Sequence, residues 1–180
     1  MIINPWADIV EIRDGKLYWC IGVCRVNDGA NHHYRQGVAL GKVGNKGYKC
    51  IRWKGKKIPV HQVIWEIHNG SIPAGKTIDH IDRNRLNNCI ENLRLATKSQ
   101  QNANTGKKSG PATSRFKGVN AWKKPGRWRL IFKGIYRGLF SSEEDAATVY
   151  NFLAYEEYGA YAALNTVPQP WLEEDGKPDL

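Results

Sequence analysis

Residues 76–104, near the middle of the chain, read KTIDHIDRNRLNNCIENLRLATKSQQNAN. A short β-like run over residues 77–81 contains Asp79 and His80, an Asn-rich loop follows, and a second strand-like run covers residues 91–97. Residues 99–104 have helical potential before Gly106 ends the segment. A strand, loop, strand and short helix bury little surface by themselves, so we expect a functional site rather than a large core here.

Asp79 and His80 have the side chains that metal-assisted cleavage of a phosphodiester bond requires. Such a reaction needs oxygen ligands for a hard cation, and a neutral imidazole outside the metal shell that takes a proton from the attacking water. Adjacent strand residues point to opposite faces, so Asp79 can face a cation while His80 faces the scissile phosphate. One carboxylate with amide oxygens leaves several coordination positions for water, which is how Mg²⁺ is usually held.

The stretch resembles the HNH (ββα-metal) nucleases, in particular the phage and intron homing endonucleases in which Asn replaces the last His. The resemblance rests on Asp79-His80, Asn92-Leu93 and the amide-rich residues 100–104. It implies that His80 is the general base, that Asp79 is a metal ligand, and that Asn92 supports catalysis by bracing the loop that positions His80. It also implies one divalent cation, Mg²⁺ or Mn²⁺, as cofactor.

The last metal ligand departs from the pattern of the family. Aligned without a gap, the metal-binding Asn of the family falls on Gln101, while Asn102 has the expected residue type one position later. Gln101 offers the same amide oxygen on a longer stem. Adjacent helical positions differ by ~100° in direction, so only one of the two is expected to ligate, and the ungapped alignment favours Gln101.

Positive charge lies on both sides of this stretch. The net charge of the chain is +10, and residues 106–141 carry ten Lys or Arg residues with no Asp or Glu. Residues 1–58 are also basic, whereas residues 59–105 are almost neutral. A polyanion bound by both basic regions would lie across the central stretch, so the charge pattern favours double-stranded DNA as the partner.

Composition argues against several other classes. Hydrophobic residues make up 41% of the chain and seven are Trp, which excludes a disordered protein over most of the length. Cys20 and Cys24 with His32 and His33 have poor spacing for structural zinc, so free thiols are favoured. We expect no membrane span, signal peptide or small-molecule cofactor, and therefore a soluble cytoplasmic protein. The resemblance to phage nucleases implies that it is phage-encoded and acts in a bacterial host.

The segment before the central stretch predicts strands followed by a helix. Bulky residues alternate with small or polar ones over residues 17–26 and 47–53, which is typical of a small antiparallel sheet with lysines on its loops. A helix is expected after Pro59 and before Asn69-Gly70. Its apolar face recurs at helical spacing: Val60, Val63, Ile64 and Ile67.

The segment after residue 114 predicts three strands and one helix. The expected strands cover residues 116–123, 127–133 and 135–140, and a capping box at Ser141-Ser142-Glu143-Glu144 begins a helix that Gly159 ends. Alternation points Trp128, Leu130 and Phe132 toward this helix. It leaves three residues on the open face of the sheet: Arg129, Ile131 and Lys133.

This unit resembles the plant ethylene-response-factor type of DNA-binding domain, which also occurs fused to phage HNH nucleases. The resemblance implies that its sheet enters the major groove of DNA. Several arginines of the family are replaced here, so a preference for GC-rich DNA is not implied. The positions that match DNA-contacting residues of the family are Lys117, Asn120, Trp122, Ile131, Lys133 and Tyr136.

Together these patterns predict an α+β protein with an N-terminal antiparallel sheet, a central ββα-metal motif and a C-terminal three-stranded sheet on one helix. The expected divisions are a basic β-rich region (1–58), the nuclease motif with its lead-in helix (59–105), a flexible basic linker (106–114), the DNA-binding domain (115–167) and an acidic tail (168–180).

The predicted activity is that of a homing-type DNA endonuclease, acting as a monomer that nicks. One alternative is a catalytically decayed HNH protein that serves as a sequence-specific DNA-binding regulator, which the shift at Gln101 and Asn102 favours. Another is an RNA-binding module, which would prefer structured RNA over duplex DNA. The sequence offers no RNA-specific aromatic motif in its support.

Overall fold

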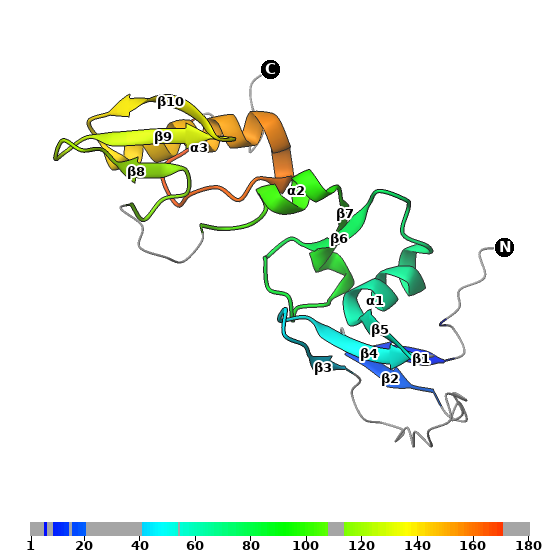
Figure 1. Ribbon diagram of the computed structural model, residues 1–180. Helices are drawn as coiled ribbons and strands as arrows, with labels where there is room; N and C mark the ends of the chain where they lie inside the picture. The colour runs from blue at the N-terminus through cyan, green and yellow to red at the C-terminus, as the bar shows by residue number, and fades with distance from the viewer. Residues whose placement is uncertain are drawn as a thin grey trace. The chain divides into compact units, whose positions relative to one another are not determined.

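The structure is a computed structural model that describes residues 6, 9–14, 16–20, 41–53, 55–107 and 114–170. It has an α+β fold built from small antiparallel sheets and a few helices, which confirms the expected class (Figure 1). Packing divides the chain into two compact units, Met1–Lys98 and Ser99–Leu180.

The first unit begins with two small sheets. The strands β1 and β2 pair as an antiparallel hairpin, and β3, β4 and β5 form an antiparallel sheet in that order. The strand bounds are Val10–Arg13 for β1, Lys16–Trp19 for β2, Lys42–Val43 for β3, Lys49–Trp53 for β4 and Lys56–Pro59 for β5. The rest of the predicted run to Val26, including Cys24, lies outside the described residues, as do His32 and His33.

Helix α1, Val60–Asn69, packs against β4 and β5 and supplies the centre of the core (Figure 1). Its bounds agree with the apolar periodicity, because Pro59 precedes it and Gly70, at φ 77°, ends it by donating its N–H to Glu66 O. The buried side chains of this core are Trp6, Val10, Leu17, Ile51, Val60, Val63, Ile64, Ile78 and Leu93.

Two short strands complete the first unit. Strand β6, Thr77–His80, pairs antiparallel with β7, Leu93–Ala96. The second strand starts two residues later than predicted, because Ile90–Asn92 form a 3₁₀ turn that leads into it. Ile78 is buried in the core formed with α1, so the hairpin is fixed to the helix that precedes it.

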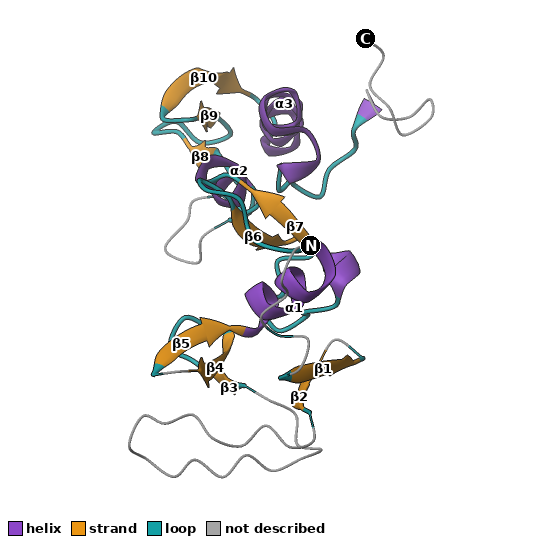
Figure 2. Cartoon of the chain, turned by 90° about the vertical axis from the view of Figure 1, so that its right-hand side faces the viewer, coloured by secondary structure: helices purple, strands orange, loops and turns teal. Residues whose placement is uncertain are grey.

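The second unit contains helix α2 from Ser99 onward, a sheet and helix α3. Strands β8 (Val119–Ala121), β9 (Trp128–Phe132) and β10 (Ile135–Phe140) form an antiparallel sheet in the order β10-β9-β8. Helix α3, Glu143–Tyr158, lies beside these strands (Figure 2), and a 3₁₀ turn, Gly159–Tyr161, follows it. The sheet and the helix enclose a core of Phe116, Val119, Leu130, Phe132, Ala146, Ala147, Tyr150 and Ala154.

The N-terminus of α3 differs by one residue from the predicted capping box. Ser142, not Ser141, has the extended backbone of an N-cap, and its hydroxyl accepts a hydrogen bond from the Asp145 N–H at 3.1 Å. Three consecutive acids, Glu143 to Asp145, fill the first turn, so they complement the positive end of the helix dipole wherever the cap falls.

The described residues include only parts of the expected linker and tail. Residues 108–113 of the predicted linker and residues 171–180 of the predicted tail lie outside them. The boundary between the two compact units falls at Lys98 and Ser99, inside α2. No helix among the described residues has the length and apolar character that a membrane span requires.

Gly118 lies in a closely packed part of the core of the second unit. Its φ is +80°, and a Cβ there would lie 2.2 Å from Tyr150 Cδ2 and 3.0 Å from the Ile131 carbonyl oxygen. We expect Gly118→Ala to lower the free energy of unfolding of this unit by about 3 kcal/mol, through overpacking added to left-handed strain. Urea denaturation measures the loss.

Gly126 is the matched control, since its φ is +70° and a Cβ there would have nothing within 4 Å. Gly126→Ala should show only the conformational cost, about 1 kcal/mol. Equal losses at the two positions would contradict the close packing of Gly118 on Tyr150.

Candidate active site

Asp79 and His80 end strand β6 and are both buried, with 6% and 4% of their surfaces exposed. In the antiparallel register Asp79 faces Arg94 and His80 faces Leu93 on β7. The hairpin is short, but its side chains are fixed by the core beneath it. The predicted base and the predicted metal ligand therefore lie on a strand that packs on the core of the first unit.

Arg94 makes an ion pair with Asp79. Its Nε and Nη2 atoms each lie 3.0 Å from Asp79 Oδ2, and both side chains are largely buried. The sequence reasoning missed this residue, although its place opposite Asp79 follows once the two strands are paired in register. The arginine neutralises the carboxylate and fixes its orientation.

The His80 ring is oriented by Asn88. His80 Nε2 lies 3.1 Å from Asn88 Oδ1, and Asn88 is itself buried. An amide oxygen only accepts hydrogen bonds, so Nε2 donates and carries the proton, which leaves the lone pair on Nδ1. Asn88 also donates through Nδ2 to Leu86 O at 3.4 Å, which supports this orientation of its amide. This is the tautomer that a base acting through Nδ1 needs.

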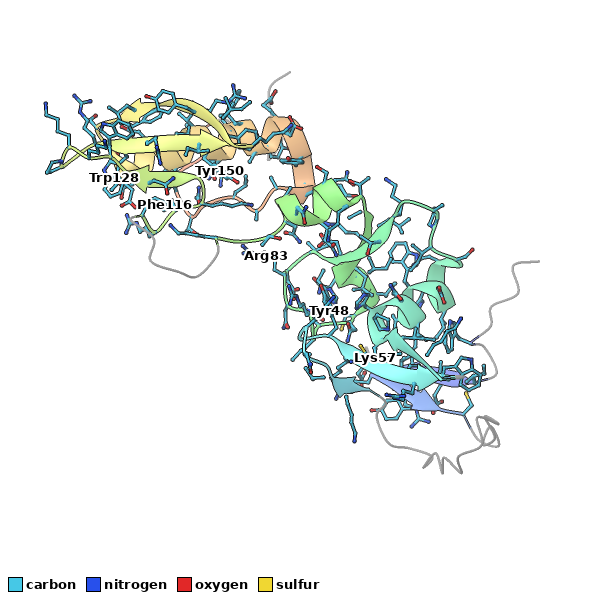
Figure 3. The ribbon with its side chains drawn as sticks, in the orientation of Figure 1. Tyr48, Lys57, Arg83, Phe116, Trp128 and Tyr150 are labelled. Atoms are coloured by element: carbon cyan, nitrogen blue, oxygen red, sulfur yellow. The ribbon has the colours of Figure 1, made fainter. Side chains whose placement is uncertain are left out.

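Two rings pack against the ring of the predicted base, His80. Tyr48, which is labelled in Figure 3, lies before β4, His61 is on α1 and His80 is on β6. The ring centroids of His61 and His80 are 5.0 Å apart with the planes at 81°, and Tyr48 lies 5.1 Å from His61 and 5.9 Å from His80. Arg85 covers Tyr48 from the loop, with Cζ 4.9 Å from its ring centroid. The His80 ring is thus restrained by packing as well as by Asn88.

His61 is a buried histidine with an unusual environment. It is 5% exposed, and its Nδ1 has no hydrogen-bond partner in the described structure. Burial lowers the pKa of His61 to about 4, and the neighbouring His80 lowers it as well. His61 is therefore neutral at physiological pH, and its buried ring packs against the rings of Tyr48 and His80.

Asn92 braces the loop between the two strands. Its Oδ1 accepts from the Asp82 N–H at 3.0 Å, and its Nδ2 donates to Asp82 Oδ1 at 2.9 Å and to Asn87 O at 2.8 Å. The Ile81 N–H donates to the Asn92 carbonyl at 2.9 Å. In these contacts Asn92 acts on loop residues, in keeping with the bracing role that the resemblance implies.

Asp82 is the centre of the same loop. It accepts hydrogen bonds from Asn87 Nδ2 at 2.7 Å and from the Asn84 N–H at 2.7 Å, besides that from Asn92. Burial raises the pKa of Asp82, but these hydrogen bonds outweigh burial and lower the pKa overall. The Asn-rich composition therefore has a structural reason, since side-chain amides satisfy backbone groups that no strand partner reaches.

The two candidate amide ligands lie on α2, Lys98–Ala103, in the part of the helix that belongs to the second unit. Gln101 is half-buried and Asn102 is exposed. Among the described residues there is no cluster of three or more His, Cys, Asp or Glu side chains suited to a metal ion.

The predicted DNA-contacting residues occupy different settings in the second unit. Register places Asn120 opposite Arg129 and Ile131 opposite Tyr136, on the face of the sheet turned away from α3. Trp122 is 41% exposed, and Arg129 Cζ lies 5.4 Å from its ring centroid. Tyr136 is 59% exposed. This face offers aromatic and cationic side chains together.

The two predicted lysines are already engaged within the chain. Lys133 Nζ lies 2.6 Å from Glu157 Oε1 on α3, and this contact raises the pKa of the lysine. Lys117 Nζ donates to the carbonyl oxygens of Ala103 and Thr105. Contact of either ammonium group with DNA would require exchange of these partners.

Comparison with known proteins finds a family match for the central segment. Residues 59–103 match the family model described as HNH endonuclease. The chain is 34% identical over 128 residues to an uncharacterized HNH endonuclease of Acanthamoeba polyphaga mimivirus, a match that covers 69% of this chain and 66% of that protein. It is 44% identical over 69 residues to Protein 3.8 of Escherichia phage T7, which covers 38% of this chain and 56% of that protein.

The chain thus spans 66% and 56% of the lengths of these two relatives. No solved structure matches it. The family match begins at Pro59, directly before α1, and ends at Ala103, the last residue of α2, so it takes in the hairpin with Asp79 and His80. Residues 59–103 of this chain are an HNH endonuclease domain.

Proposed function

We propose that this chain is a metal-dependent endonuclease of the homing type that hydrolyses phosphodiester bonds in double-stranded DNA. The observation that carries the proposal is the hydrogen bond from His80 Nε2 to Asn88, beside Asp79, inside the HNH domain. It leaves Nδ1 as the proton acceptor of a buried, immobilised imidazole. The homing type rests on the resemblance of the sequence alone.

In the proposed reaction, His80 Nδ1 takes a proton from the water that attacks the phosphorus atom. Asn88 keeps the ring in the required tautomer, and the packing of Tyr48 and His61 keeps its orientation. Asn92 holds the loop that carries Asn88. When bound, a divalent cation stabilises the charge that builds on the phosphate and on the leaving 3′ oxygen.

The donor atoms suit Mg²⁺ or Mn²⁺. The Asp79 carboxylate and the amide oxygen of Gln101 or Asn102 are hard oxygen ligands, and so few protein ligands leave room for water and phosphate oxygens. Arg94 lies on Oδ2 of Asp79 and pairs with this carboxylate. In this proposal Arg94 orients the carboxylate.

The second unit is proposed to bind the duplex. Its open sheet face presents Trp122, Arg129, Ile131 and Tyr136, while α3 covers the opposite face. Aromatic side chains beside cations suit contact with bases and phosphates at once. A monomer with a single HNH domain would nick one strand for each binding event.

Plasmid cleavage tests the proposal. Supercoiled DNA incubated with the protein should become nicked in Mg²⁺ or Mn²⁺ and stay intact in EDTA. A protein that binds the plasmid but leaves it intact under every divalent cation would overturn the nuclease and support the rival function.

That rival is a catalytically decayed HNH protein that regulates by binding specific DNA sequences. Two observations favour it: the Asp79 carboxylate is neutralised by Arg94, and Gln101 replaces the Asn of the family. Both would weaken a cation site without disturbing the DNA-binding face of the second unit. The plasmid assay combined with duplex binding separates the two functions.

Asn88 gives a sharper test of the mechanism. Asn88→Ala removes the acceptor that fixes the tautomer of His80, so we expect the cleavage rate to fall by about 10–100-fold, as for groups that orient functional histidines elsewhere. Asn88→Asp retains an acceptor and should keep more of the rate. Similar rates for wild type and Asn88→Ala, measured in single-turnover cleavage, would remove Asn88 from the mechanism.

A further inference from the structure

The C-terminal end of α2 is tied into the second unit by several hydrogen bonds. The Gln101 carbonyl accepts from Thr105 Oγ1 at 3.4 Å and the Asn102 carbonyl from the Thr105 N–H at 3.2 Å. The Ala103 carbonyl accepts from the Ala163 N–H at 3.2 Å and from Lys117 Nζ at 2.8 Å. Carbonyls that a helix leaves without an internal partner are thus satisfied from outside.

The Lys117 ammonium group bridges two carbonyls at this point. Besides Ala103 O, its Nζ donates to Thr105 O at 2.6 Å. A cation at the C-terminus of a helix is stabilised by the helix dipole as well as by the hydrogen bonds. The ammonium is therefore held where two carbonyls and the negative end of α2 converge.

The backbone of Lys117 is fixed from the opposite side. Asn165 accepts the Lys117 N–H through Oδ1 at 2.7 Å and donates through Nδ2 to the Lys117 carbonyl at 3.2 Å. Asn151 of α3 is fully buried and holds the backbone of Asn165 in turn. Its Oδ1 accepts from the Asn165 N–H at 2.7 Å, and its Nδ2 donates to the Asn165 carbonyl at 2.9 Å. These contacts form a continuous connection from α3 through Asn165 and Lys117 to α2.

This anchoring is important because α2 is short. Six residues, Lys98–Ala103, form fewer than two turns, and a helix of that length does not persist in water by itself. Ala103 and the adjacent Asn104 are the buried residues at its end. Tertiary contacts must therefore stabilise α2, and those at its C-terminus are among them.

We propose that Lys117 is a positioning residue, whose ammonium group fixes the end of α2 and the amide side chains on it, and that it is not a DNA contact. A phosphate contact would require Lys117 to give up its bonds to the carbonyls of Ala103 and Thr105 and the dipole interaction, so that only the Ala163 N–H would still hold the Ala103 carbonyl. The expected effect of Lys117 on cation binding rests on the proposed function, because the candidate ligands Gln101 and Asn102 lie on α2. The anchoring of α2 by Lys117 does not rest on that function.

Hydrogen exchange in the full-length protein, without metal or DNA, tests the anchor. Lys117→Met keeps the aliphatic stem and removes the donors, so we expect exchange of the amides in residues 101–105 to accelerate about tenfold or more. Amides of β9, in the core of the same unit, should exchange as in the wild type. Lys124→Met, which removes an exposed lysine from the hairpin of the same domain, should leave α2 unchanged.

Two further measurements separate anchoring from DNA contact. In EDTA, Lys117→Met should bind duplex DNA within about twofold of Lys124→Met. In cleavage assays, its Mg²⁺ midpoint should rise while the rate at saturating Mg²⁺ recovers. Lys117→Gln, which keeps one donor, should lie between Lys117→Met and wild type in α2 exchange, and it replaces Lys117→Met if that variant does not fold.

Unchanged exchange in α2, or a loss of duplex affinity without faster exchange, would overturn the anchoring role. If the protein cuts no DNA at all, the nuclease proposal fails, but the exchange result still decides the role of Lys117. The two failures are therefore distinguishable.

Discussion

Replacing His80 with alanine is expected to abolish DNA cutting and to leave duplex binding nearly intact. A positioned general base contributes about 10²–10⁴-fold to the rate, and within the part of the chain that the structure describes no other imidazole is placed to replace it. His61 is the adjacent candidate, but its Nδ1 is buried and its ring packs edge-on against the His80 ring. The binding surfaces proposed here lie on residues 115–167, so affinity should not depend on His80.

The measurement is single-turnover cleavage of plasmid in Mg²⁺ together with duplex binding in EDTA. His68, exposed near the end of α1, supplies the control, since His68→Ala removes an imidazole outside the ring cluster. Imidazole added to the buffer should restore part of the activity of His80→Ala, because the variant leaves a space for the missing ring. Cleavage at the wild-type rate, or loss of duplex binding by a folded variant, would contradict the assignment.

Much of the local structure around His80 could be predicted because it follows from periodicity and turn chemistry. The helix from Pro59 to Gly70 was defined by apolar spacing and by its two ends, and the strand with Asp79 by the β-like run before an Asn-rich loop. The second strand was predicted too early, since Ile90–Asn92 satisfy their backbone as a 3₁₀ turn. Local rules therefore located the elements within a few residues.

The contacts that orient the functional groups could not be predicted in the same way. That Asn88 rather than a neighbouring asparagine reaches His80 depends on how the whole loop folds around Asp82. The ring cluster requires α1, β6 and the turn before β4 to meet, which no short-range pattern encodes. Arg94 could be found only after strand pairing was known.

Lysines illustrate a second limit of sequence reasoning. Alternation along a strand gives the direction of the Cα–Cβ bond, but a lysine side chain is long enough to turn back toward its own domain. Lys133 reaches Glu157 on the helix behind the sheet, and Lys117 reaches the end of α2. Resemblance to a DNA-binding family gave both residues one role, whereas the structure supplies each with an intramolecular partner.

His61 leads to the second prediction, which concerns stability and pH. Burial, together with the nearby His80, lowers the pKa of His61 to about 4 in the folded chain, whereas the unfolded chain has the ordinary value of about 6.5. Above pH 6.5 both states are neutral at this residue, so it adds no pH dependence. Between pH 6.5 and 4 the unfolded chain takes up a proton that the folded chain does not bind.

The free energy of unfolding of the first unit should therefore fall as the pH is lowered through this window, by about 2 kcal/mol between pH 7 and pH 5 and about 3 kcal/mol by pH 4. His61→Phe keeps an aromatic ring in the cluster and removes the titrating group. The free energy of unfolding of this variant should therefore not show this decrease. Hydrogen exchange of α1 peptides in increasing urea, at pH 7 and pH 5, measures the difference within the first unit.

His68→Phe is the matched control, because it removes an exposed histidine from the same helix and should retain the full decrease. Equal decreases in the wild type and in His61→Phe would show that His61 is solvated in the folded chain. That result would also remove the packing that restrains the His80 ring, because a hydrated His61 could not form the dry edge-on contact at 5.0 Å. The stability measurement thus tests the geometry of the proposed active site without any DNA or metal present.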